Sequence, residues 1–286
     1  MVDDLKLVKD LRDKTGAGFL DCKEALASNN GDIESAIDYL RKKGLAKASK
    51  KSAREANEGA IGFFENDNIC VLIKVNSETD FAAKGDTFLD FVDYLGKILL
   101  DLNNLDLDLD TFLNLEVSTK SIKEIVDELI AKIGENILIS DLRIFNKKNE
   151  NSSFYVHNAY RKNIGKIISI LKYSSLSNHE NTQNFAKNLC MHIAAMKPDA
   201  IDENDLDKAT IEKEFNIQKE LIVSSGKPEN VINKILDGKM KKYYSEVTLL
   251  NQSFVLNPEK SIREIINSEY KEDKFEINTF SFLSLT

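Results

Sequence analysis

Apolar residues recur with a helical period through the first 44 positions of the chain. Three segments show this pattern, and their apolar positions are Leu5, Val8 and Leu11, then Phe19, Cys22, Ala25 and Leu26, then Ile33, Ala36, Ile37 and Leu40. The tetrapeptides TGAG and NNGD interrupt the pattern, and Asp32 is placed to cap the third segment. The pattern predicts a module of three short helices, the last of which ends at Gly44.

A run of basic residues follows the three segments. Residues 41–54 contain seven lysines and arginines and no acidic residue. One interpretation is a basic strip that contacts a partner. The other, which we favour, is a helix C-terminus whose macrodipole is stabilised by positive charge, followed by a solvated linker. Residues 1–54 are therefore predicted to form an N-terminal domain with a basic linker.

From Gly59 onward the apolar pattern changes, and a β-hairpin followed by a helix is expected twice. The expected elements are strands around a turn at 65–68, helices over 79–102, 121–133 and 181–196, and a second hairpin over 154–173. The Leu-Asp stretch 102–115 is expected to be a loop with a short irregular element, because Asp and Asn are poor strand residues. The repeat predicts an α+β core of two related halves, residues 55–140 and 141–286.

Two polar helical segments with thin apolar stripes follow, over 205–225 and 229–243. Gly226, Lys227 and Pro228 separate them, so they predict a helical hairpin near residues 190–240 that projects from the second half. The apolar stripe permits either a homodimer or a contact with another protein. A short helix over 261–266 and a strand over 274–285 complete the pattern.

Composition narrows the class of partner. The chain has 286 residues, 42% hydrophobic content and a net charge of −8. An acidic chain is a poor binder of nucleic acid and of anionic membranes, because phosphate contacts need clustered Lys and Arg. The sequence has no apolar run of transmembrane length, and because its first residues are acidic and lack an apolar segment, we expect no secretory leader. Three widely separated cysteines argue for a reducing compartment, so we expect a cytoplasmic protein.

Motifs for covalent chemistry are missing. The chain has no GxxxxGK[ST] loop and no GxSxG elbow, and GAGFLD is a turn without a preceding strand. The three histidines have no partner at metal-ligand spacing. His192 is expected to be a core residue, whereas His157 fits a contact role and a structural role equally well. We therefore expect a protein that acts by binding and is not an enzyme. We expect no catalytic residue, no cofactor, no metal ion and no direct binding of nucleotide.

The segment VNSETDFAAKGDTF (75–88) allows two interpretations. In the first, Thr79 and Asp80 start a helix and Phe81 fills the core. In the second, Phe81 is an exposed tip that enters another protein, with Thr79 capping the helix behind it. The residues alone favour the first interpretation.

Three parts of the chain together resemble the family of bacterial elongation factor Ts, the nucleotide exchange factors of translation. They are LVKDLRDKTGAGFLDCKEAL with NGDIESAIDYLRKKG, then VNSETDFAAKGDTF, then MHIAAMKP with SGKPENVINKILDGKMKKYYSEVTLLNQSFV. They occur in the family's order and spacing and cover most of the chain. The resemblance implies an N-terminal three-helix domain similar to ubiquitin-associated domains, then a core of two related halves with a projecting helical hairpin.

The resemblance implies a partner and a mechanism. The partner is elongation factor Tu, a GTPase, and the family speeds release of its GDP so that GTP can bind. The family's Thr-Asp-Phe motif enters the partner near its magnesium and phosphate site, and the matching residues are Thr79, Asp80, Phe81 and Ala82. This favours the second interpretation of Phe81. The competing hypothesis is a passive protein-binding module without exchange activity, and the exposure of Phe81 separates the two.

The resemblance also implies partner contacts outside this motif. In the N-terminal domain they are Arg12, Phe19 and Leu20, although the family often has methionine at the last two positions. His157 is the candidate contact of the second half with the partner's β domains. The turn after His157 is longer than usual, and Ser253 stands where proline is common, so the departures from the family concern the periphery more than the motif.

Overall fold

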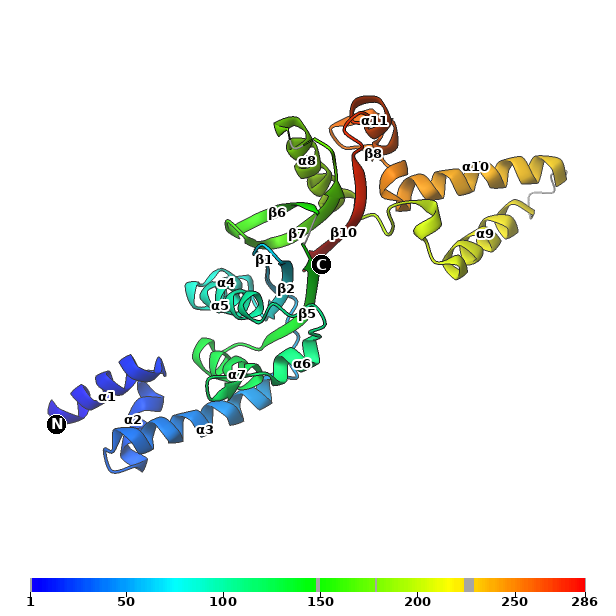
Figure 1. Ribbon diagram of the computed structural model, residues 1–286. Helices are drawn as coiled ribbons and strands as arrows, with labels where there is room; N and C mark the ends of the chain where they lie inside the picture. The colour runs from blue at the N-terminus through cyan, green and yellow to red at the C-terminus, as the bar shows by residue number, and fades with distance from the viewer. Residues whose placement is uncertain (1, 148–149, 178, 224–228, 286) are drawn as a thin grey trace. The chain divides into compact units, whose positions relative to one another are not determined.

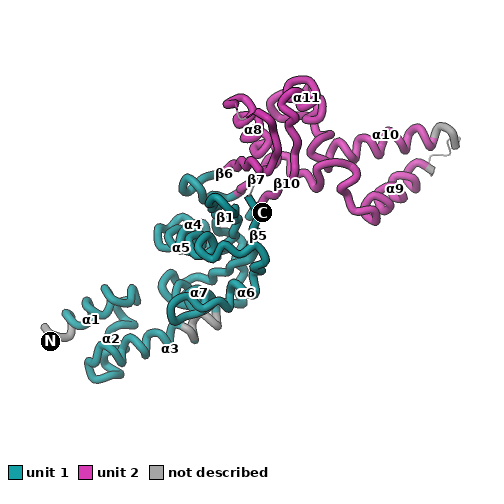
Figure 2. Tube along the Cα trace, viewed as in Figure 1, with its two compact units in different colours: residues 1–148, 158–166, 283–286 teal, residues 149–157, 167–282 magenta. Residues whose placement is uncertain are grey.

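A computed structural model describes residues 2–147, 150–177, 179–223 and 229–285. The chain divides into two compact units (Figure 2), with residues 1–148, 158–166 and 283–286 in unit 1 and residues 149–157 and 167–282 in unit 2. Both contain helices and strands (Figure 1), which confirms the predicted α+β class. No helix within the described ranges is long and apolar enough to cross a membrane.

The three N-terminal helices of unit 1 form as the apolar period predicts. They are α1 (Val2–Thr15), α2 (Phe19–Ser28) and α3 (Ile33–Lys51). Their shared core consists of Val8, Leu11, Cys22, Ala25, Leu26 and Ala36. Asp32 caps α3, because its Oδ1 accepts a hydrogen bond from the Ser35 N–H at 2.8 Å. Leu5, however, is 62% exposed, although it belongs to the apolar stripe predicted for the first helix.

The prediction that the third helix ends at Gly44 is wrong, and the exposed linker begins only after Lys51. Helix α3 continues to Lys51 and packs against α7 (Ile122–Ile133). At the contact Gly44 is buried, and a Cβ placed on it would lie 2.9 Å from Cβ of Ala131. Gly44 therefore marks a close approach of two helices. Arg41 adds ion pairs to Glu124 at 3.6 Å and to Glu128 at 3.5 Å.

The β-sheet of unit 1 is antiparallel, with β2 between β1 and β5. The strands are β1 (Glu58–Glu65), β2 (Ile69–Ser77) and β5 (Ile137–Asn146), and the short strands β3 (Glu116–Val117) and β4 (Lys120–Ser121) pair with each other. Helix α5 (Asp86–Leu102) packs on β1 and β2 through fully buried side chains that include Phe88, Val92, Leu95 and Leu99. Residues of the sheet and of α5 belong to one apolar core of unit 1, which also includes side chains of α6 (Leu109–Asn114) and α7.

Two helices of unit 1 differ from the predicted pattern. The helix predicted over 79–102 is interrupted at Gly85, so that a five-residue helix, α4 (Asp80–Lys84), precedes α5. The Leu-Asp stretch contains a regular helix, α6 (Leu109–Asn114), which Asp108 caps and whose Phe112 is fully buried. In contrast, α7 begins where predicted, and the structure shows a capping box formed by Ser121 and Glu124 at its start.

Most of the second predicted hairpin and the helix after it belong to unit 2, whereas residues 158–166 around the turn of the hairpin belong to unit 1. The elements are β6 (Asn151–Arg161), β7 (Ile164–Ser174), α8 (Glu180–Met196) and β10 (Glu276–Ser284), and β7 pairs with both β6 and β10. Helix α8 packs on this sheet through an aromatic cluster in which the rings of Phe185 and Tyr270 stack with centroids 4.2 Å apart. The chain therefore forms a hairpin followed by a helix twice, as the sequence pattern predicts.

The helical hairpin of unit 2 consists of α9 (Lys208–Val223) and α10 (Glu229–Val247). Its core is small and contains Ile222, Leu236 and Met240. The hairpin runs over 208–247 instead of beginning near residue 190, because residues up to Met196 belong to α8. Gly226, Lys227 and Pro228, the predicted break, lie outside the described residues.

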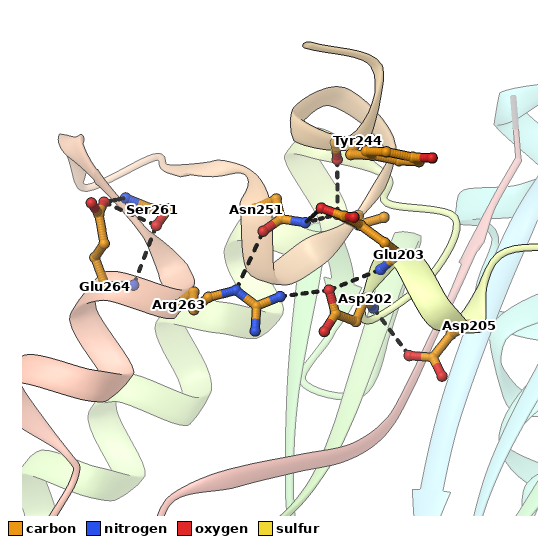
Figure 3. Close-up of polar contacts among 9 residues, drawn as sticks. Asp202, Glu203, Asp205, Tyr244, Asn251, Ser261, Arg263 and Glu264 are labelled. Atoms are coloured by element: carbon orange, nitrogen blue, oxygen red, sulfur yellow. Dashed lines mark hydrogen bonds and ion pairs between the residues drawn. The ribbon is translucent and has the colours of Figure 1, made fainter. Parts of the chain in front are cut away.

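Polar contacts fix the base of this hairpin (Figure 3). They join the end of α10 to two 3-10 turns, η1 (Glu203–Asp205) and η2 (Leu249–Asn251), and to α11 (Ile262–Glu269). Arg263 donates to Asp202 at 2.5 Å and to Asn251 at 3.3 Å, while Asn251 donates to Glu203 at 3.2 Å. The short strands β8 (Ser253–Phe254) and β9 (Asn257–Ser261) lead from η2 into α11. The hairpin is thus held by hydrogen bonds at one end and by a thin apolar core along its length.

His192 is a core residue, as predicted. Its ring is fully buried on α8, and its Nδ1 accepts a hydrogen bond from the Val255 N–H at 3.3 Å. Nε2 lies 2.8 Å from Oε1 of Gln252 and therefore carries the proton of the neutral ring. Burial lowers the pKa of His192 below its ordinary value of 6.5, which outweighs the opposing effect of the Gln252 hydrogen bond.

We expect this histidine to make the protein less stable in mild acid. Between its lowered pKa and 6.5 the unfolded chain binds a proton at this ring and the folded chain does not. The free energy of unfolding should therefore fall as the pH drops below 6.5 and should stop falling, for this group, below the lowered pKa. Urea denaturation of wild type and His192→Gln from pH 7 to pH 5 measures the effect. The variant should be less stable at pH 7 and have the flatter profile; equal slopes would contradict the assignment.

Candidate functional site

The Thr-Asp-Phe segment forms a short tip between β2 and α5. Strand β2 ends at the buried Ser77, whose hydroxyl donates to the carbonyl of Thr79 at 2.9 Å. Helix α4 then turns Ala83 into the core, where it is fully buried, while the Phe81 side chain is 85% exposed. The interpretation that Phe81 fills the core is therefore wrong. A single turn of helix anchored by Ala83 holds a large apolar side chain in solvent.

Thr79 fixes the start of this turn. Its hydroxyl oxygen accepts a hydrogen bond from the Ala82 N–H at 3.2 Å, so Thr79 is the N-cap of α4, as the residues predict. The same hydroxyl donates to Oε1 of Glu135 at 2.7 Å, and the Thr79 N–H donates to Oε2 at 2.9 Å. The hydrogen bonds of Thr79 with Glu135 and with the Ala82 N–H therefore fix the backbone segment that carries the four residues of the motif.

Asp80 presents a negative charge beside Phe81. Its Oδ2 lies 2.7 Å from Nζ of Lys84, one helical turn away. The hydrogen bond from Lys84 holds the pKa of Asp80 below its ordinary value, and the same contact raises the pKa of Lys84. Both side chains are about half exposed, so solvent screens the pair, and either group can exchange its partner for another ion. At neutral pH the tip therefore combines an apolar ring with a carboxylate that can change partners.

The predicted N-terminal contact residues are all exposed. Arg12 lies near the end of α1, and Phe19 and Leu20, which are 44% and 78% exposed, begin α2. Phe19 shares a groove of about 610 Å³ with Leu5 from α1, whereas Leu20 and Arg12 do not line it. The structure therefore groups Phe19 with a residue that the sequence pattern assigned to the core.

His157 lies within β6, not at the end of the strand as the pattern suggested. Its side chain is exposed, and its Nδ1 lies 3.2 Å from the Tyr155 hydroxyl. The two rings are tilted, with centroids 6.0 Å apart. The pair forms a polar and aromatic surface on unit 2.

Two residues near these surfaces were not identified from the sequence. Leu5 fits the apolar stripe of the first predicted helix. The spacing of apolar residues does not tell which residues of such a stripe are buried and which are exposed. Glu135 follows Gly134, the C-cap of α7, and its contact with Thr79 spans 56 positions of the chain. The spacing of apolar residues reports only local structure, so it cannot predict a contact between residues that far apart in the chain.

Comparison with known proteins gives consistent matches. A family model described as Elongation factor TS matches residues 78–285, which include the tip. A protein named Elongation factor Ts from Sinorhizobium fredii is 40% identical over 265 residues, which cover 93% of this chain and 86% of that protein. The Elongation factor Ts of Dinoroseobacter shibae is 44% identical over 256 residues, covering 90% of this chain and 84% of the relative.

Proposed function

The chain belongs to the elongation factor Ts family, and we propose that it is the guanine nucleotide exchange factor for elongation factor Tu. It binds the GDP form of that GTPase, disturbs the magnesium and phosphate site, and promotes GDP release so that GTP can bind. The observation that carries the proposal is the 85% exposure of Phe81 on a capped turn beside the Asp80 carboxylate. The protein works in the cytoplasm, binds no nucleotide itself and makes no covalent bond.

Thr79, Asp80, Phe81 and Ala82 carry the exchange step. The Phe81 ring has few rotatable bonds, so its burial in the partner costs little conformational entropy. Asp80 brings a carboxylate toward a site that holds a metal ion and phosphates, and it competes there with the groups that bind the metal. Thr79 caps the turn and keeps both side chains in place. This tip lowers the affinity for GDP by stabilising a conformation of the partner whose metal contacts are already lost.

The remaining surfaces hold the partner without acting on its nucleotide. Arg12, Phe19 and Leu20 bind the GTPase domain, and His157 binds the partner's β domains. The hairpin formed by α9 and α10 either lies on the partner or pairs with a second copy through its exposed Phe215, Ile217 and Leu221. In this proposal residues 1–54, 55–140 and 141–286 act as the N-terminal domain and the two halves of the core.

The alternative function is a passive protein-binding module, in which the N-terminal helices recruit another protein and the core is only a scaffold. A passive module has no need for an aromatic ring held in water, since exposing its apolar surface forgoes the stabilisation that burial would give. The exposed Phe81 therefore favours exchange activity over passive binding.

Thermodynamic linkage gives a test of the proposal. We expect the protein to bind nucleotide-free elongation factor Tu more tightly than the complex with GDP and magnesium, by the same factor by which it weakens GDP. Coupling of this kind is typically about 5- to 150-fold. Titration calorimetry with the nucleotide-free and GDP-bound partner gives one factor, and GDP titrations with and without this protein give the other. Equal affinity for both forms would favour the passive module.

A further inference from the structure

We propose that Glu135 is the positioning residue of the exchange tip: it orients Thr79 and thereby holds Phe81 and Asp80 in the geometry that acts on the partner. This inference rests on the proposed exchange function and adds to it a residue outside the motif. Glu135 does not need to touch the partner, because it acts through the N-cap of α4.

The hydrogen bonds of Thr79 determine which way its hydroxyl points. A threonine hydroxyl has one proton to donate and lone pairs to accept with. The proton goes to Oε1 of Glu135 at 2.7 Å, which leaves a lone pair for the Ala82 N–H at 3.2 Å. Oε2 of the same carboxylate accepts from the Thr79 N–H at 2.9 Å. Glu135 therefore fixes both the backbone and the side chain of the capping residue.

A reciprocal contact runs in the opposite direction. The Asn136 N–H donates to Oε1 of Glu78 at 2.6 Å, so adjacent residues on the two segments exchange carboxylate-to-backbone bonds. These contacts lie directly beyond the end of the β2–β5 ladder, whose last pair is Ser77 and Ile137. We call the contacts among residues 78, 79, 135 and 136 the clasp. Through these side-chain hydrogen bonds, the two segments stay connected beyond the end of the strand ladder, up to the first residue of the tip.

The segment that carries Glu135 is itself fixed. Gly134 ends α7 with a left-handed φ of 90°, and its N–H donates to the carbonyl of Ile130 at 2.9 Å. The Gly134 carbonyl accepts from Nζ of Lys51, at the end of α3, at 2.5 Å. Asn136 is 5% exposed, and its amide donates to the carbonyl of Arg54 at 2.7 Å. A clasp attached to this support can hold the tip in one position.

Helix α4 needs this external support. It has five residues, and a single turn of helix is unstable by itself because nucleation fixes several residues for one hydrogen bond. Phe81 adds no packing inside the protein, since it is exposed. Without the clasp the turn would depend on the packing of Ala83, the Ser77 hydroxyl and the solvent-screened pair of Asp80 and Lys84. The fraction of molecules with a correctly placed tip would then fall, and the exchange rate at saturation would fall with it.

The test uses the full chain and five variants. Glu135→Ala removes both bonds, Glu135→Gln leaves one acceptor oxygen, and Thr79→Val removes the hydroxyl without changing the shape of the side chain. Thr79→Ser keeps the hydroxyl and serves as the conservative rescue. Glu116→Gln, on the exposed β3, is the matched control for loss of a surface carboxylate.

Two readouts separate the inference from the function on which it rests. Hydrogen exchange of the protein alone reports the Thr79 and Ala82 amides and needs no partner. Release of labelled GDP from elongation factor Tu, at increasing concentrations of each variant, reports the maximal rate and the concentration for half of it. A variant that is merely partly unfolded keeps the wild-type maximal rate and only needs a higher concentration, whereas a misplaced tip lowers the maximal rate.

For Glu135→Ala we expect the Thr79 and Ala82 amides to exchange hydrogen about tenfold faster than in wild type. We also expect its maximal rate of GDP release to be about tenfold lower. Glu135→Gln should lie between Glu135→Ala and wild type in both measurements. Thr79→Val should match Glu135→Ala in its rate, Thr79→Ser should have a higher rate than Thr79→Val because it keeps the hydroxyl, and Glu116→Gln should match wild type. Wild-type values for Glu135→Ala in either readout, or a wild-type rate for Thr79→Val, would overturn the inference. A wild-type protein that leaves GDP release unchanged would overturn the proposed function and this role with it, while the amide protection would still show whether the clasp holds the tip.

Discussion

Replacing Phe81 with alanine is expected to reduce the maximal acceleration of GDP release by about 30-fold, the effect of removing an interface residue worth about 2 kcal/mol. The same variant should unfold at the wild-type temperature. Because the side chain is 85% exposed, its removal opens no cavity and loses little packing inside the protein. The measurements are GDP release at saturating concentrations of the variant and a thermal unfolding curve.

Tyr94→Ala is the matched control for this variant. Tyr94 lies on α5 in the same unit, is aromatic and is 39% exposed, but it does not belong to the tip. Its removal should leave the exchange rate at the wild-type value. An equal loss of rate in both variants would indicate a general effect of surface aromatic residues, and a wild-type rate for Phe81→Ala would show that the ring is not the group that acts on the partner.

Adding a methyl group at two helical glycines is expected to change stability in opposite directions. In an exposed helix, Gly→Ala gains about 0.5–1 kcal/mol because alanine loses less conformational entropy. Gly238, on α10, has open space around the position of a Cβ, so Gly238→Ala should stabilise the protein by that amount. Gly96, on α5, faces Phe64, and a Cβ there would lie 2.4 Å from three atoms of the ring.

Phe64 cannot move aside easily, because it is buried in the core of unit 1. Overpacking of this kind typically costs about 1–3 kcal/mol, which exceeds the gain in helix propensity. Gly96→Ala should therefore lower the free energy of unfolding, and because α5 supports the tip, it should also lower the exchange rate at temperatures near the unfolding transition. Urea denaturation of both variants, followed by circular dichroism, measures the contrast. If both substitutions stabilise the protein, the Phe64 ring can move aside without loss of stability, and the prediction for Gly96→Ala is wrong.

Local patterns predicted the elements of the fold better than the contacts between them. The hairpin around residues 66–68 and the start of α7 near Ser121 follow from the spacing of apolar residues, which reports structure over a few residues. Gly44 was expected to end a helix, because glycine often does so. The structure shows instead that Gly44 allows a close approach to Ala131. This use of glycine depends on a residue 87 positions away, which local sequence patterns do not report.

The candidate site shows the same limit. The Thr79 cap could be predicted, since the acceptor and the donor are three residues apart. The exposure of Phe81 could not, because an apolar residue next to a strand end fits a core as well as a surface, and only the family resemblance favoured the surface. Glu135 has no local signature at all. Its role depends on two segments that the β2–β5 ladder brings together.

The most direct test of the exchange function is the rate of release of a fluorescent GDP analogue from purified elongation factor Tu, in the presence of magnesium, as wild-type protein is added. We predict that the rate rises with concentration and reaches a plateau well above the intrinsic rate. Unchanged release at concentrations where the two proteins demonstrably bind would contradict the account, and the chain would then be a passive binder of elongation factor Tu.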